Sequence, residues 1–364
     1  MACRVTDLSD HTLATLRLEL EAQGFKPSHA GPMLRSHYRA GSGADANGRR
    51  LPEALSRRLS DQLERRSAST LSRQLAQDGT AKLLIRLGDG RTVESVLMPG
   101  YRPDRAAGCL SSQVGCAMGC DFCATTKTGF ERNLSSGEIV EQFLALRQQA
   151  CARGRRLSTV VFMGMGEPLL NLDPVCAAIE RMAGNDMGGL GFRQVTVSTV
   201  GIVPGIDALA ATGLNVHLAI SLHAPDDETR TRLLPMGRRY GLGEILQAAD
   251  RYQASSGRTV SVQYCLLGGV NDSKGHAEAL AGLIGDRRMH VNLLRYNPTG
   301  ISLRGEVYRP STDEATEAFI GLLAARGVVA HIRRSRGPDI DAACGQLRHK
   351  SGTSGLFPRT TLQH

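Results

Sequence analysis

The sequence has no tryptophan, few aromatic residues and no long apolar run. Only 4% of its 364 residues are aromatic, and no uninterrupted apolar stretch approaches the roughly 20 residues of a membrane-spanning helix. The segment Met-Ala-Cys-Arg-Val-Thr-Asp at the start lacks the apolar core of a signal peptide. We therefore expect a cytoplasmic protein without a membrane partner.

Lysine is scarce as well, although the chain is basic. The formal net charge is +9 with 44 basic residues, and the lysines are limited to Lys26, Lys82, Lys127, Lys274 and Lys350. Arginine binds phosphate in a forked geometry and stacks on unpaired bases, which favours a nucleic-acid partner. A general preference for arginine in the genome explains the same composition equally well.

Nine cysteines in a chain of this kind indicate metal binding or catalysis rather than a disulfide framework. Cys116, Cys120 and Cys123 are spaced so that three thiolates can converge from one tight loop. A [4Fe–4S] cluster normally takes four thiolates, and a set of three leaves one iron free to bind S-adenosylmethionine for radical chemistry. With Cys109 as a fourth ligand, structural zinc is the alternative. Four of the other cysteines are expected to act only as small apolar side chains that fill space, and they are Cys3, Cys151, Cys176 and Cys265.

Residues 1–75 have the pattern of a small helical region that could contact RNA. Leu13, Leu16 and Leu20 share one helical face, and Gly24 follows where that helix should end. A second amphipathic stretch has leucine at every fourth position and paired arginines beside it, which form either a solvated face or a phosphate contact. Its residues are Leu51, Leu55, Leu59, Leu63, Arg57, Arg58, Arg65 and Arg66.

Residues 76–104 are predicted to form a β-hairpin extension. Two β-rich runs, 81–87 and 91–98, flank Gly88-Asp89-Gly90, a typical hairpin turn. Glu94 lies in the second run, and composition alone makes it an exposed carboxylate.

Residues 105–350 alternate strand and helix patterns. Repeated βα units predict a parallel sheet. Together with the apolar run at Cys109, these units give six or seven strands. This number predicts an incomplete version of the eight-stranded βα barrel. The predicted fold is therefore α/β, a partial βα barrel with a helical N-terminal region, a hairpin extension and a tail at 351–364. The strand runs are 158–163, 194–198, 216–222, 260–267, 290–296 and 328–332, and the helical runs are 136–147, 173–182, 242–252 and 313–325.

In such barrels the active-site residues lie at the C-terminal ends of the strands. One strand here leads into Gly164-Met-Gly166-Glu167-Pro168, where the glycines allow close approach to a ligand and the carboxylate can bind an ammonium. Each such motif alone is weak, since glycine pairs are usually turns and a single histidine is usually structural. Together they predict a site for S-adenosylmethionine. The other strand ends carry Ser198-Thr-Val-Gly201, Ser221-Leu222-His223 and Arg295-Tyr-Asn297.

Cys344 lies near the C-terminus between small residues. Such a thiol is either accessible on a mobile segment or, as most free cysteines are, buried and inert. The surrounding sequence, Asp-Ile-Asp-Ala-Ala-Cys-Gly-Gln-Leu at 339–347, does not distinguish these alternatives by itself.

Taken together, these motifs resemble the RlmN/Cfr family of radical-SAM RNA adenine methyltransferases. The resemblance spans roughly residues 75–350 and rests on the cysteine series, Gly-Met-Gly-Glu-Pro, Ser-Leu-His-Ala-Pro, Gly-Val-Asn-Asp at 269–272, and the segment around Cys344. It implies that Cys116, Cys120 and Cys123 hold one [4Fe–4S] cluster. It also implies that the residues binding S-adenosylmethionine are Gly166, Glu167, Ser198, Ser221, Leu222, His223 and Asn297.

The resemblance further implies two S-adenosylmethionine molecules per turnover. One would methylate Cys344, and the other, cleaved reductively, would yield a 5′-deoxyadenosyl radical that takes hydrogen from this methyl group. The carbon radical would add to an adenine ring carbon, which is not nucleophilic enough for direct methylation. Glu94 would accept the ring proton, and Cys109 would release the product through a transient disulfide with Cys344. The base must leave its stack to be reached.

The motifs differ on which ring carbon is methylated. Arg295-Tyr-Asn297-Pro-Thr is closer to the Cfr branch, which methylates C8, whereas Gly-Met-Gly-Glu-Pro-Leu-Leu-Asn and Ser-Leu-His-Ala-Pro are closer to the RlmN branch, which methylates C2. We expect C2 methylation of an adenine in 23S rRNA, with tRNA as a second substrate, by a monomer that needs an electron donor. The alternatives are C8 methylation and a non-catalytic iron–sulfur or zinc RNA-binding protein. A binding protein would have no use for the Cys109–Cys344 pair.

Overall fold

The computed structural model describes residues 8–38, 51–57 and 68–347, except residue 186. The first predicted helix is α1 (Leu13–Ala22), in which Leu16 and Leu20 are buried, and it is followed by α2 (Ala30–Tyr38). Gly24, with φ +77°, turns the chain after α1. Residues 53–57 are helical and Leu55 is buried. Several sequence predictions fall outside the described residues, namely those for Cys3, Arg58, Leu59, Leu63, Arg65, Arg66 and the tail.

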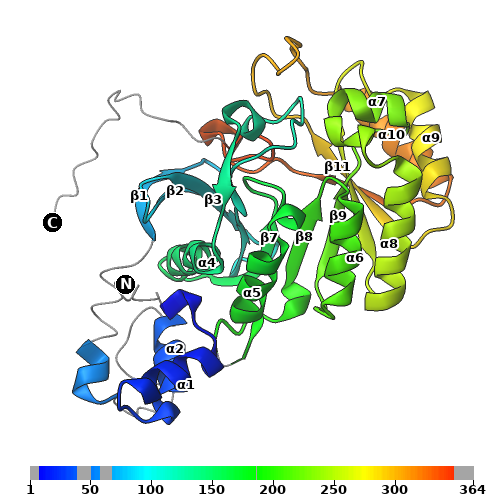
Figure 1. Ribbon diagram of the computed structural model, residues 1–364. Coiled ribbons are helices and arrows are strands. Elements are labelled where there is room, and N and C mark those ends of the chain that lie inside the picture. The colour runs from blue at the N-terminus through cyan, green and yellow to red at the C-terminus, as the bar shows by residue number, and fades with distance from the viewer. Residues whose placement is uncertain (1–7, 39–50, 58–67, 186, 348–364) are drawn as a thin grey trace.

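The N-terminal helices pack below α4 (Ser136–Cys151), on the side away from the hairpin strands (Figure 1). Asp10 Oδ1 accepts the Gly137 N–H at 2.9 Å and so caps the first turn of α4. Ser9 Oγ donates to Glu141 Oε1 at 2.5 Å and lies 2.8 Å from His37 Nε2. Because these last three side chains are buried, polar contacts as well as leucines fix the N-terminal region to the barrel.

The main sheet of the described residues has ten strands, and seven of them are parallel. The parallel strands follow one another across the sheet in chain order, and β1 and β12 are the two edges. The sheet is therefore open, and the predicted partial barrel is confirmed. The parallel strands are β4 (Arg105–Cys109), β7 (Arg156–Phe162), β8 (Val195–Thr199), β9 (His217–Ser221), β10 (Val260–Leu266), β11 (Met289–Arg295) and β12 (Ala330–Arg333).

The predicted hairpin forms, but it continues the main sheet. Its strands are β2 (Ala81–Leu87) and β3 (Thr92–Pro99), and β3 pairs antiparallel with β4. On the other side, β2 pairs antiparallel with β1 (Ala68–Leu75). The helical prediction for residues up to 75 is therefore wrong for this segment. Strand β1 is polar and mostly exposed, and it has no apolar pattern typical of a strand. Its extended structure depends instead on its pairing with β2.

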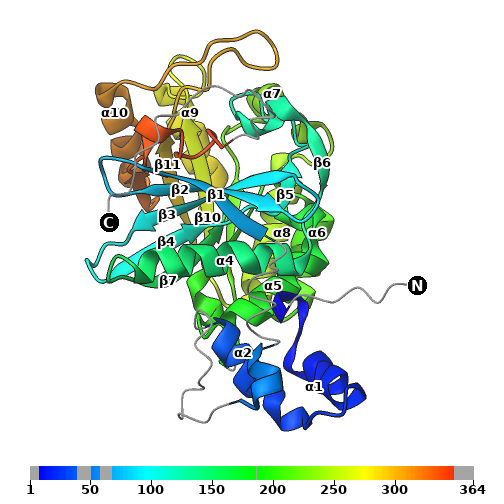
Figure 2. The same cartoon turned by 90° about the vertical axis from the view of Figure 1, so that its left-hand side faces the viewer.

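The helices lie along one face of the parallel strands and leave the other to the loops at their C-terminal ends (Figures 1 and 2). No helix in the described part of the chain is long and apolar enough to cross a membrane. Three of these helices were absent from the sequence prediction: α6 (Val203–Ala211), α7 (Asp227–Leu233) and α9 (Lys274–Ile284). The others are α5 (Leu172–Ala183), α8 (Leu242–Ser256) and α10 (Asp313–Ala325), and a separate small sheet pairs β5 (Gln113–Gly115) with β6 (Phe130–Asn133).

Candidate active site

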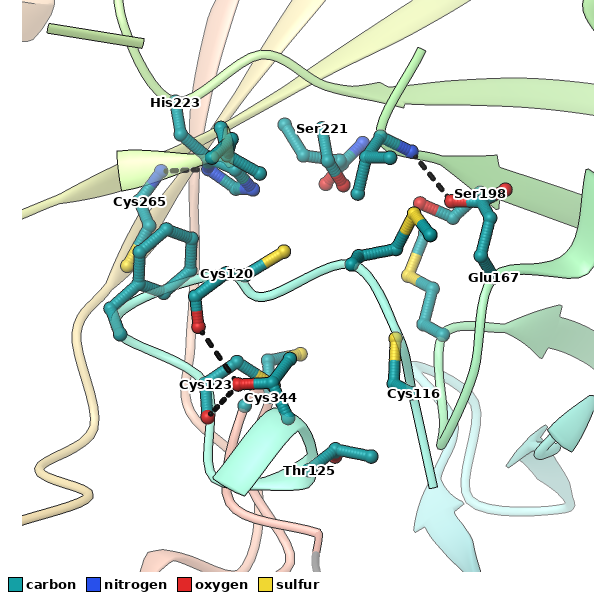
Figure 3. A pocket seen from close by; sticks show the side chains of 18 of the residues that line it. Cys116, Cys120, Cys123, Thr125, Glu167, Ser198, Ser221, His223, Cys265 and Cys344 are labelled. Atoms are coloured by element: carbon teal, nitrogen blue, oxygen red, sulfur yellow. Dashed lines mark hydrogen bonds between the residues drawn. The ribbon is translucent and has the colours of Figure 1, made fainter. Parts of the chain in front are cut away.

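A pocket opens at the C-terminal ends of the parallel strands (Figure 3). Loops after β4 and β7 and the ends of β8 and β9 all contribute side chains to it. The barrel rule therefore places these residues together, as the sequence predicted. Of the predicted residues, the pocket is lined by Cys116, Cys120, Cys123, Gly166, Glu167, Ser198, Ser221, His223 and Cys344.

The loop that carries the three cysteines is held by hydrogen bonds of the Thr126 and Asp121 side chains. Thr126 Oγ1 donates to the carbonyls of Cys120 and Cys123 at 3.1 and 3.0 Å. Asp121, between these cysteines, accepts from the Arg304 N–H at 3.0 Å and from the Tyr308 hydroxyl at 2.6 Å. The long segment between β11 and α10 is thereby joined to the cysteine loop.

The donor set matches an iron–sulfur cluster with one open iron, since all three cysteines are free thiols. Burial and, after it, the two neighbouring thiols raise the pKa of Cys120 well above its usual value; a bound cluster would instead stabilise the thiolates. In the described residues no three Cys, His, Asp or Glu side chains are close enough to hold a single metal ion.

Glu167 is buried at the wall of this pocket, and the backbone orients its carboxylate. Oε1 accepts the Leu169 N–H at 3.0 Å, and Oε2 accepts the Val200 N–H at 2.9 Å. Burial raises the pKa of Glu167 to about 7 in spite of these hydrogen bonds. A cationic group bound beside it would favour the ionised form. Gly166 has φ +100°, and a Cβ there would lie 2.5 Å from Gln113 Cβ, so that this position requires glycine.

His223 has a left-handed backbone with φ 60°, and the Gly-Val-Asn-Asp motif holds it there. Asn271 Nδ2 donates to the carbonyls of His223 and Cys265 at 2.8 and 2.7 Å, while its Oδ1 accepts the Leu267 N–H at 2.7 Å. His223 Nδ1 accepts the Cys265 N–H at 2.9 Å, so that Nε2 carries the proton and acts as a donor. Burial lowers the pKa of His223 to about 3. The motif thus shapes the pocket, and the imidazole is neutral.

Arg230, on α7, is a residue that the sequence analysis did not identify. It is fully buried, and Nη1 donates to the carbonyls of Ser221 and Leu222 at 3.1 and 2.7 Å. Nη2 donates to the Val200 carbonyl. Arg230 therefore joins the ends of β8 and β9. The Leu222 side chain is fully buried and lies outside the pocket lining, so that only its backbone takes part in this arrangement.

Two further residues of β10 line the pocket. Gln263 Oε1 is buried without a hydrogen-bond partner in the described chain, and a polar ligand atom would satisfy it. Cys265, expected to be a filler, lies at the pocket wall near Cys123 and Cys344, and burial, with these thiols after it, raises its pKa. Neither residue stands in a recognisable motif, and only the folded sheet brings them to the site.

A second cavity adjoins the first and shares Cys344 with it. Cys109, at the end of β4, lines this second cavity and is not part of the first, which argues against Cys109 as a fourth metal ligand. Asn297 also lies here, and its Nδ2 donates to the Cys344 carbonyl at 3.4 Å. Among the described residues, no acidic side chain lines this arginine-rich cavity. Its basic residues are Arg102, Arg105, Arg295, Arg333, Arg334 and Arg336.

Both thiols in the arginine-rich cavity have raised pKa values. Burial raises the pKa of Cys109 to about 12, and the Cys344 thiol is the next largest cause. Cys344 retains solvent-exposed surface. Burial of its thiol by the surrounding cavity walls nevertheless raises the pKa of this group too. The raised pKa values disfavour the thiolate that sulfur–sulfur exchange needs, so that the shared cavity, and not ready ionisation, suits this pair to exchange.

Glu94 is buried, and the expectation of an exposed carboxylate is therefore wrong. Its Oε1 lies 3.1 Å from Lys82 Nζ on the neighbouring strand. Its backbone N–H contacts Met165 Sδ at 3.4 Å, and its carbonyl accepts from Ser111 Oγ at 2.7 Å. The backbone of Glu94 thus contacts the loop that contains Gly166 through Met165.

Comparisons with known proteins agree with this geometry. The model of the Radical SAM superfamily matches residues 110–281. A protein of Opitutus terrae named probable dual-specificity RNA methyltransferase RlmN 1 is 64% identical over 349 residues, which cover 96% of this chain and 97% of that one. A Rhodopirellula baltica protein named probable dual-specificity RNA methyltransferase RlmN is 42% identical over 349 residues, covering 96% and 92% of the two chains. The crystal structure of a radical SAM methyltransferase from Sphaerobacter thermophilus matches with a TM-score of 0.87 and 41% identity, covering 94% of this chain and 99% of that one.

Proposed function

Because the chain belongs to the RlmN/Cfr family of radical SAM RNA methyltransferases, we propose that it methylates C2 of an adenine in 23S rRNA and also acts on tRNA. The observation that carries this proposal is the position of Cys344 between two cavities. One of them contains the three-cysteine loop, and the other contains Cys109 and six arginines.

In this proposal the first cavity holds the cofactors. Cys116, Cys120 and Cys123 would bind a [4Fe–4S] cluster, which would supply the electron that cleaves S-adenosylmethionine and take back the electron left on the base. The Glu167 carboxylate would receive the ammonium of S-adenosylmethionine. His223 Nε2 would donate a hydrogen bond to an acceptor atom of S-adenosylmethionine, and Gln263 Oε1 would accept one from a donor atom of the same molecule.

Cys344 would carry the methyl group. Its sulfur takes the methyl group from one S-adenosylmethionine as the sulfonium carbon–sulfur bond breaks. A second S-adenosylmethionine would supply the radical that removes one hydrogen atom from this methyl group, and the Cys344 methylene would then bond to the adenine carbon. Glu94 takes the proton of the ring C–H bond.

Cys109 would release the product. Its thiolate attacks the Cys344 sulfur, the sulfur–methylene bond breaks, and the methylene carbon keeps the electron pair and gains a proton. The base is then methylated, and Cys109 and Cys344 form a disulfide. A two-electron thiol reductant must reduce this disulfide before the next turnover.

The arginine-rich cavity would admit the RNA. Arginine neutralises phosphate and stacks on an unpaired base, and a base removed from its stack must enter a pocket to be modified. In this scheme the partners are RNA and an electron donor, and the protein acts as a monomer. Sedimentation of the protein with and without RNA would measure its mass and so test whether it is a monomer.

The experiment that tests this function is anaerobic reconstitution, followed by mass spectrometry of nucleosides from unmodified rRNA treated with S-adenosylmethionine and a reductant. We expect 2-methyladenosine. The Arg295-Tyr-Asn297-Pro sequence supports a second candidate, C8 methylation, which 8-methyladenosine would establish instead. Intact cofactor cleavage with neither nucleoside would contradict the proposed substrate.

A further inference from the structure

Lys82 has a side chain that is buried beside a carboxylate. Its Nζ lies 3.1 Å from Glu94 Oε1, and only 8% of the Lys82 side chain and 7% of the Glu94 side chain are exposed. Burying two charges loses the solvation of both, and a buried pair is weak evidence for stability alone. A function at this position accounts for the pair better.

The strand register places this pair on the face of the sheet that forms the arginine-rich cavity. Lys82 is directly opposite Val96, and Val96 is directly opposite Cys109. Residues directly opposite each other in antiparallel strands share a face. Glu94 shares that face too, because it is two positions from Val96. Since Val96 and Cys109 line the cavity, the ion pair and the Cys109 thiol lie on one surface.

Lys82 also contacts the segment that carries Cys344. Its Nζ donates to the Asp341 carbonyl at 3.2 Å, and the next residues, Ala342 and Ala343, line the arginine-rich cavity. An ammonium has three N–H donors, so that it can bind the carboxylate and this carbonyl at once. Lys82 is therefore a direct link between Glu94 and the Cys344 segment.

We propose that Lys82 is a positioning residue, which orients the Glu94 carboxylate and links it to the segment that carries Cys344. The inference rests on the proposed function. When the ring C–H bond breaks, the proton binds a Glu94 oxygen and the pair of electrons stays with the base.

The test uses the full-length reconstituted protein with an rRNA transcript and compares Lys82→Met, Lys82→Arg and Lys274→Met. Lys274 is exposed at the start of α9 and serves as the matched control. Three products are measured: methyl on Cys344 by peptide mass spectrometry, 5′-deoxyadenosine, and methylated adenosine. In Lys82→Met we expect methylated Cys344 and continued 5′-deoxyadenosine formation, but about 100-fold less methylated adenosine, the scale of a lost general base. Lys82→Arg should restore most of the product, and Lys274→Met should match the unmodified chain.

A double variant separates positioning from a structural role. If Lys82 acts through Glu94, adding Lys82→Met to Glu94→Gln should lower the product no further. A wild-type yield of methylated adenosine in Lys82→Met would overturn the inference. Loss of Cys344 methylation in Lys82→Met, or an additive loss in the double variant, would also overturn it, because Lys82 would then only anchor the segment. Failure of the proposed function differs from these results, since the unmodified chain itself would show no methyl group on Cys344.

Discussion

The Cys109 and Cys344 thiols lie in one cavity, although Cys109 ends the first parallel strand and Cys344 follows the last. The Cys344 segment is fixed by Asn297, which donates to its carbonyl, and by the Ala124 N–H, which donates to the Gly345 carbonyl at 2.7 Å. The three-cysteine loop and the Cys344 segment are therefore hydrogen-bonded neighbours.

Replacing either thiol should stop methylation at a different stage. Cys344→Ala removes the methyl carrier, so we expect no methylated RNA and no covalent protein–RNA species. Cys109→Ala leaves the carrier but removes the attacking thiol, so we expect a covalent complex that survives denaturing electrophoresis with labelled RNA. Cys151→Ala, at an exposed free thiol on α4, is the matched control. Absence of the complex in Cys109→Ala would refute the releasing role of Cys109.

Arginines of the second cavity should contribute to RNA affinity through phosphate. Replacing Arg102 or Arg334 with Gln should weaken binding and reduce the slope of log affinity against log salt by roughly 0.7 to 0.9 for each lost contact. Arg326, the C-cap residue of α10, is paired with Glu278 at 3.2 Å, lies outside both cavities and should show neither effect. Fluorescence anisotropy at several salt concentrations measures both quantities. An unchanged slope in the cavity variants would exclude these arginines from phosphate contact.

Arg230→Leu should destabilise the barrel, because three backbone carbonyls would lose a buried donor. Charged hydrogen bonds of this kind lead us to expect a loss of about 3 kcal/mol or more in the free energy of unfolding. Arg232→Leu is the control on the same helix. Arg232 is 48% exposed and paired with Glu306, and a surface pair of this kind contributes at most about 1 kcal/mol. Equal urea midpoints for the two variants would contradict the structural role of Arg230.

His223 should make stability depend on pH. Burial lowers its pKa to about 3, so that the folded chain keeps the imidazole neutral while the unfolded chain takes up a proton below about pH 6.5. The stabilisation from this group is therefore complete above that pH and is lost as the pH falls. Between pH 7 and 5, the free energy of unfolding should fall by about 2 kcal/mol more in the unmodified chain than in His223→Asn. Parallel pH profiles for the two proteins would contradict this account. Asn tolerates the left-handed backbone.

Periodicity predicted the regular parts of this fold. The apolar runs predicted from 158 onward are parallel strands in chain order, because buried parallel strands and amphipathic helices each have a clear apolar pattern. Helix α6 was missed since its sequence contains proline and glycine, and α7 was missed since it is short and charged. Strand β1 has no apolar alternation and depends on its partner strand. Local sequence alone does not encode such pairing.

The site was predicted where motifs lie at strand ends, and the cofactor-binding and catalytic roles of its residues stay predictions. The positions of Arg230, Gln263 and Cys265 depend on long-range contacts that no local pattern records. For Lys82 a signal existed. A hairpin centred on Gly88-Asp89-Gly90 puts Lys82 on the strand beside Glu94, and two opposite charges near each other on paired strands already predict an ion pair.

The central claim is that the methyl group passes through Cys344 as a methylene. The most direct test supplies S-adenosylmethionine with a fully deuterated methyl group and measures the mass of the methylated adenosine. Transfer through Cys344 removes one deuterium to 5′-deoxyadenosine and adds one solvent proton at release, so the product should carry a CHD2 group and the Cys344 peptide a CD3 group. A CD3 group on the adenosine would mean direct methyl transfer and would contradict the account.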